Sequence, residues 1–84
     1  MGSGKYSKRK VISALRHFEK ISGKFMLLDA TRENYKIKPI FASDISYPVA
    51  ANHPNIHESI VKGIAARLEK WKVCTKAEFI NEIK

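Results

Sequence analysis

Apolar residues recur at helical spacing in the N-terminal quarter of the chain. After Ser7, they fall on every third or fourth position, at Val11, Ala14, Leu15, Phe18 and Ile21, and Ser22-Gly23 follows the last of them. Because successive helical residues are about 100° apart, these positions form one stripe. Ser is a preferred N-cap and Gly a preferred C-terminal stop, so the pattern predicts a helix over about residues 8–21.

The C-terminal third of the chain predicts two more helices. Asn55 is an N-cap candidate with Glu58 three residues later, and an apolar stripe continues to about Lys72. Thr75 and Glu78 repeat this capping-box spacing before a last apolar pattern that reaches the chain end. The stripes consist of Ile56, Ile60, Ile64, Leu68 and Trp71 in the longer helix, and of Phe79, Ile80 and Ile83 in the last.

Two stretches between these helices have the patterns of strands. Residues 24–30 form a nearly continuous apolar run, and residues 34–41 alternate apolar side chains with Lys36 and Lys38. The polar residues between them predict an antiparallel hairpin with its tip near residues 31–33. Pro39 cannot donate a hydrogen bond, so the second strand is expected to lie at a sheet edge or to lose regularity there.

The order of these elements predicts one α+β domain over residues 7–84, with an N-terminal helix, a β-hairpin, a loop over residues 42–54, and two C-terminal helices packed on the sheet. Residues 1–6 are expected to be a flexible leader. Two strands make a weak sheet, so we expect either a third short strand within residues 43–50 or a homodimer that extends the sheet. Gly63, beside Ala65 and Ala66, predicts a close internal contact with the first helix, or a contact with a partner helix.

Positive charge is concentrated near the N-terminus. The formal net charge is +8, and the first 24 residues alone carry seven basic side chains and one acid, Glu19. A localised basic field favours a polyanionic partner. The sequence therefore predicts a small non-enzymatic nucleic-acid-binding or regulatory protein, with DNA and RNA both open. Phosphates would be contacted by Lys8, Arg9, Lys10, Arg16, Lys20, Lys24, Lys36 and Lys38. The alternative is an inhibitor or adaptor that docks on an acidic protein surface.

Aromatic side chains offer a second way of binding nucleic acid, because bases stack on them in single-strand-binding proteins. Tyr35 and Phe41 share the sequence parity of Ile37 and are expected in the core. Tyr6 and Tyr47 lie outside the regular elements, so the pattern leaves them freer to contact a ligand.

The sequence shows no spacing of residues that indicates a catalytic or metal-binding site. His53 and His57 are four residues apart, but Pro54 and the expected cap at Asn55 separate them, and further zinc ligands would be distant. We expect no metal, no cofactor and no catalytic residues, although a minimal magnesium-dependent nuclease stays open. A single cysteine, Cys74, fits a reducing cytoplasm, and the longest apolar run is too short to span a membrane.

Overall fold

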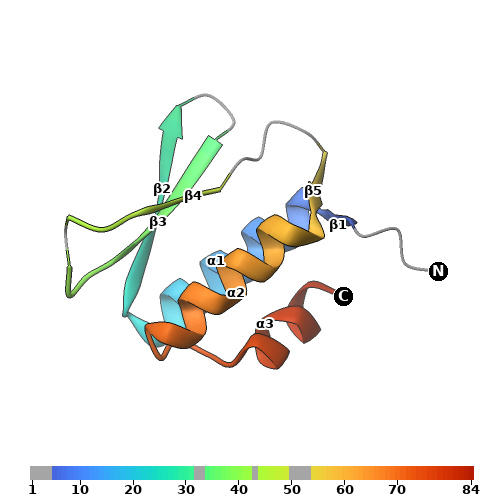
Figure 1. The fold of residues 1–84 in the computed structure, drawn as a ribbon. Helices are drawn as coiled ribbons and strands as arrows, with labels where there is room; N and C mark the ends of the chain where they lie inside the picture. Colours follow the sequence, from blue (N-terminus) through green and yellow to red (C-terminus); the bar gives the residue numbers. More distant parts are fainter. Residues whose placement is uncertain (1–4, 32–33, 43, 50–53) are drawn as a thin grey trace.

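The computed structural model describes residues 5–31, 34–42, 44–49 and 54–84. Along the chain, the elements are β1 (Lys5–Ser7), α1 (Lys8–Ser22), β2 (Phe25–Thr31), β3 (Asn34–Pro39), β4 (Tyr47–Val49), β5 (Asn55–His57), α2 (Glu58–Lys70) and α3 (Lys76–Ile83). The predicted α+β fold, with its N-terminal helix, hairpin and two C-terminal helices, is confirmed (Figure 1).

Helix α1 has the boundaries that its local sequence predicts. Its buried side chains, Val11, Ala14, Leu15 and Phe18, come from the predicted stripe, but Ile21 at the end of that stripe is 62% exposed. Ser7 occupies the predicted N-cap position without a side-chain hydrogen bond. The helix ends at Gly23, whose φ of 62° is left-handed and whose N–H donates to the Glu19 carbonyl over 3.1 Å. A residue without a Cβ adopts this conformation at little cost, which explains the sharp stop.

The larger sheet has three antiparallel strands in the order β2-β3-β4. The hairpin of β2 and β3 is confirmed, and β4 supplies the expected third strand by pairing Tyr47–Val49 with residues 35–37 of β3. Strand β3 is therefore central, so the edge position is wrong, whereas the alternative, that the strand loses its regularity at Pro39, is confirmed because β3 ends there. Pro39 is tolerated because it lies beyond the residues that pair with β4, where β3 ends.

A second, two-stranded ribbon joins the N-terminus to the start of α2. Strand β1 pairs with β5 in antiparallel register, Tyr6 opposite Ile56, and the Lys8 N–H donates to the Pro54 carbonyl over 2.9 Å. The flexible leader expected over residues 1–6 therefore cannot include Lys5 and Tyr6, because both belong to β1. Residues 1–4 lie outside the described residues. The same pairing keeps Asn55 extended, so α2 begins two residues later than predicted, with His57 in place of Asn55 as its N-cap.

The elements form three layers. Helix α1 contacts β2 and helix α2 contacts β4, so the two helices cover opposite edges of one sheet face, and α3 contacts both helices (Figure 1). One apolar core links the sheet to the helices, and the rings of Phe18 on α1 and Phe79 on α3 have centroids 6.2 Å apart. The Thr75–Glu78 capping box that begins α3 is present as predicted.

Three residues that the sequence placed in internal contacts can now be compared with the structure: Tyr35, Phe41 and Gly63. Tyr35 packs against the core, whereas Phe41 is 67% exposed, so the core position expected for Phe41 is wrong. Strand β3 ends two residues before Phe41, and the alternation of the strand no longer applies there. Gly63 makes a close internal contact, but its neighbour is the Tyr47 hydroxyl and not α1.

Among the described residues, no helix is both long and apolar enough to cross a membrane.

Candidate nucleic-acid interface

The outward side of α1 carries four exposed cations. Arg9, Lys10, Arg16 and Lys20, which we call the α1 face, lie on the arc opposite the buried stripe. At a rise of 1.5 Å per residue, the α-carbons of Arg9 and Lys20 are separated by about 16 Å along the helix. The remaining Lys or Arg residue of the helix, Lys8, is half-buried at the first position of α1. The α1 face thus presents a row of cations long enough to meet several phosphates.

Glu19, the single acid of α1, is held against the sheet. Its Oε2 accepts a hydrogen bond of 2.8 Å from the Leu27 N–H of β2. Its Oε1 lies 3.8 Å from an Arg16 guanidinium nitrogen, a long ion pair on a well-exposed arginine. Exposed pairs of this kind contribute little, so Arg16 is left largely available to an anion. The positive charge of the α1 face is therefore only weakly offset from within the helix.

Lys24 connects the end of α1 to the end of α2. Its Nζ donates a hydrogen bond of 2.8 Å to the Lys72 carbonyl, and its own carbonyl accepts from the Ile40 N–H over 3.0 Å. Lys72 is the one non-glycine residue with a positive φ, 61°, in the described part of the chain. These contacts bring the C-terminal ends of α1 and α2 together with the end of β3, and they gather Lys20, Lys24 and Lys72 at one end of the molecule.

Lys36 and Lys38 belong to a different surface. Each is half-buried on the central strand, where Lys36 pairs with Leu28 and Lys38 with Met26. Their neighbour Ile37 points into the core, and side chains alternate along a strand, so both lysines project from the sheet face opposite the helices. The structure therefore does not join Lys36 and Lys38 to the α1 face, although the sequence places all of them among the predicted phosphate ligands.

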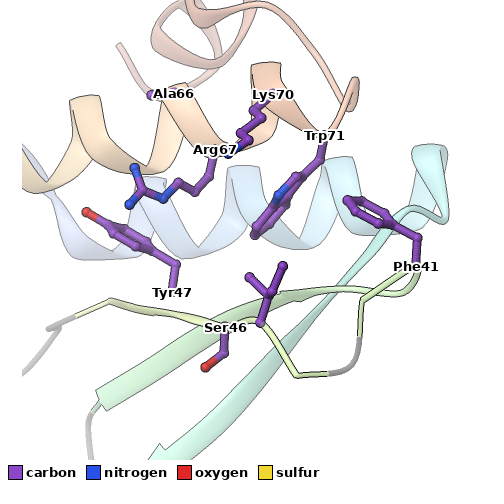
Figure 2. A pocket seen from close by; sticks show the side chains of 8 residues that line it. Phe41, Ser46, Tyr47, Ala66, Arg67, Lys70 and Trp71 are labelled. Atoms are coloured by element: carbon purple, nitrogen blue, oxygen red, sulfur yellow. The ribbon is translucent and has the colours of Figure 1, made fainter.

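A pocket of about 570 Å³ opens between the C-terminal half of α2 and the segment that joins β3 to β4 (Figure 2). Its apolar walls come from Phe41, Ile45, Tyr47 and Trp71, and its cations are Arg67 and Lys70. We call it the aromatic pocket. The Arg67 guanidinium lies over the Tyr47 ring, 4.4 Å from its centroid. The sequence pattern placed Tyr6 and Tyr47 outside the regular elements, which is wrong, because they lie in β1 and β4 and pack partly against the core. It also gave no sign that Arg67 and Trp71 would meet Tyr47.

Of the histidine and cysteine candidates, the structure describes His57 and Cys74. The His57 Nδ1 accepts from the Ser59 N–H over 3.1 Å and caps α2, while His53 lies outside the described residues. Within the ranges that the structure describes, no group of three or more His, Cys, Asp or Glu side chains could hold a metal ion. Burial, assisted by the negative charges of Glu78 and Glu69, raises the pKa of the Cys74 thiol from 9.0 to about 11.

Because its pKa is raised, the Cys74 thiol is expected to react slowly with alkylating agents. A shift of two pH units lowers the thiolate fraction at about pH 8 roughly 100-fold, and the thiolate is the reactive form. Because a thiolate of higher pKa is also more nucleophilic, iodoacetamide should alkylate native Cys74 at least about 10-fold more slowly than the same thiol in urea, as followed by mass spectrometry. Equal rates in the two states, after correction for the effect of urea on a free thiol, would contradict the raised pKa.

Comparison of the chain with protein-family models, with curated proteins and with solved structures found no match.

Proposed function

We propose that this protein binds nucleic acid by placing the α1 face against the phosphate backbone, and that it does so without catalysing a reaction. The observation that carries the proposal is the exposed arc of Arg9, Lys10, Arg16 and Lys20, on a helix whose one acid is turned to the sheet. Arg and Lys side chains are the usual ligands of nucleic-acid phosphates, and such contacts position a protein without reading sequence. A regulatory role in a reducing cytoplasm, compatible with the lone Cys74, belongs to the same proposal.

Four cations are enough for measurable electrostatic binding. Each neutralised phosphate releases condensed counterions, and the logarithm of the binding constant falls with the logarithm of salt concentration by about 0.9 per contact on duplex DNA. The α1 face alone then gives a slope of about −3.6, which is a loss of roughly 100-fold in affinity between about 50 and 200 mM salt. Lys8 and Lys24 lie close to the ends of this row, and their participation would steepen the slope.

The experiment is a titration of the protein with labelled DNA and RNA of random sequence at several salt concentrations, read by fluorescence anisotropy. We expect saturable binding with a slope of about −3 to −4 on duplex DNA. A folded sample that binds neither nucleic acid at low salt would overturn the proposal and would favour an acidic protein surface as the partner of the α1 face. Adding magnesium ions should leave the nucleic acid intact, because cleavage would instead indicate a nuclease.

A further inference from the structure

We propose that the aromatic pocket holds an unpaired nucleobase together with its phosphate, which makes the protein a reader of single-stranded nucleic acid. This inference rests on the proposed function, since it identifies the form of nucleic acid that the α1 face holds. It concerns a different surface, because α1 covers the β2 edge of the sheet and the pocket lies against α2 at the β4 edge.

The walls of the aromatic pocket are apolar and open to solvent. Phe41 is 67% exposed and Ile45 is 46% exposed, while the Trp71 ring lies deeper, at 7%. Single exposed apolar residues are ordinary on a protein surface, but a group of them around a concave site marks a binding site. Figure 2 shows the rings of Phe41 and Trp71 near one another and Tyr47 farther along the pocket. A planar, apolar group is the ligand that such walls accommodate.

The charged residues that line the aromatic pocket are cationic and therefore favour an anionic ligand. Arg67 and Lys70 both line it, and among the lining residues that the structure describes none is acidic. The Arg67 side chain lies on the Tyr47 ring, so its planar guanidinium is held in place and can form two parallel hydrogen bonds with a phosphate. A ligand that combines a flat aromatic ring with a nearby negative charge satisfies both the walls and the cations, and a nucleotide has this combination.

The size of the aromatic pocket agrees with this ligand. Sites for small ligands commonly enclose about 300–1,000 Å³, and a volume of about 570 Å³ lies within that range. A paired base is stacked inside a duplex and cannot enter such a site without leaving the helix, which is costly. The pocket therefore favours single strands, whose bases are free to stack on aromatic side chains.

A chain of lysines leads from the α1 face to the aromatic pocket. Lys20 lies near the end of α1, and the hydrogen bond from Lys24 Nζ to the Lys72 carbonyl joins that end to the end of α2. Lys72 follows Trp71 and Lys70 directly in sequence, and both of these line the pocket. A flexible strand can thus follow cations around this end of the molecule, whereas a straight duplex on the α1 face cannot bend into the pocket.

Trp71 supplies the readout for a test, because it is the one tryptophan of the chain and it lines the pocket. The probes are a single-stranded DNA of about twelve nucleotides, within the range of single-strand site sizes, and the blunt duplex that contains the same strand. Salt-dependent binding of both probes is expected from the α1 face. The single strand should also quench Trp71 fluorescence and bind at least about 10-fold more tightly than the duplex.

Variants of the aromatic pocket then separate the two surfaces. Phe41→Ala and Arg67→Lys should each weaken single-strand binding by about 5- to 100-fold, because stacking on the ring or the guanidinium is lost, and should leave duplex binding unchanged. Met26→Ala, an exposed apolar residue on the outer sheet face, and Lys62→Gln, an exposed lysine elsewhere on α2, are the matched controls and should change neither affinity. Phe41 and Arg67 are exposed, so both variants should fold.

The outcomes distinguish the inference from the proposed function. Equal affinity for the two probes, no quenching of Trp71 and no effect of Phe41→Ala would overturn the pocket as a base site while leaving binding by the α1 face in place. Failure of both probes to bind would overturn the proposed function and the inference with it. A loss of duplex binding in Phe41→Ala equal to the loss of single-strand binding would also contradict the inference, since the pocket would then not discriminate unpaired bases.

Discussion

The variant in which Arg9, Arg16 and Lys20 are all replaced by Gln is expected to bind duplex DNA on the order of 100-fold more weakly than the wild-type protein at about 0.1 M salt. The three substitutions remove three of the four cations of the α1 face. The slope of affinity against salt concentration should accordingly flatten from about −3.6 to about −0.9. The slope is the more diagnostic quantity, because it reports the number of phosphate contacts and not the strength of any one of them.

Gln is chosen because it keeps the helix intact. It is a good helix former, and unlike Glu it places no negative charge near the C-terminal end of the helix dipole at Lys20. Arg16→Gln removes only a long, exposed ion pair, and Glu19 keeps its hydrogen bond from the Leu27 N–H. Circular dichroism should therefore show unchanged helix content in the variant.

The matched control replaces Lys62, Lys76 and Lys84 by Gln. This variant loses the same net charge, and its three lysines are exposed on α2, on α3 and at the chain end. Their ion pairs with Glu58 and Glu69 are at the surface and contribute little to stability. If net charge alone drives binding, the two triple variants will lose affinity equally. A local interface at α1 requires a much larger loss in the first.

The second large effect is expected on stability, for Phe79→Ala. Phe79 is completely buried, and its ring packs near that of Phe18 and attaches α3 to α1. Removing a buried Phe side chain typically costs about 3–5 kcal/mol, because the lost apolar contacts and the remaining cavity both destabilise the folded state. A domain of this length has a free energy of unfolding of only about 4–12 kcal/mol. The midpoint of urea unfolding should therefore fall sharply.

Phe41→Ala is the matched control for this measurement. It removes the same atoms from a side chain that is 67% exposed, and substitutions at such sites usually change stability by less than about 0.5 kcal/mol. Comparable losses in the two variants would mean that α3 does not rest on Phe79 as described. A stable Phe41→Ala also secures the use of this variant as a probe of the aromatic pocket.

The α1 face illustrates what a linear sequence predicts well. The apolar stripe of α1 and its terminal glycine are local signals, and the 100° helical increment then fixes which side chains face outward. The positions of Arg9, Arg16 and Lys20 followed from that rule without knowledge of any other element. The hairpin and the capping box at Thr75 were predictable for the same reason, because each depends on residues close together in the chain.

The start of α2 and the environment of Phe41 could not be predicted in this way. Asn55 has the sequence of a helix cap, but it is extended because β5 pairs with β1, which lies about fifty residues earlier in the chain. Phe41 follows the parity of β3, but the strand ends at Pro39 and the ring is left at the surface. In both cases a partner distant in sequence, or the lack of one, outweighed the local pattern.

By itself, then, the sequence determined the helices, the hairpin, the α+β class and the concentration of cations on α1, because each of these depends on spacing within one short segment. Only the tertiary structure decided that β3 is central, that Lys36 and Lys38 face away from the helices, and that Lys24 meets the Lys72 carbonyl. It also decided that Phe41, Tyr47, Arg67 and Trp71 line one pocket. These residues are brought together by packing of the helices on the sheet, and that packing is set by the whole core, so no window of the sequence contains it.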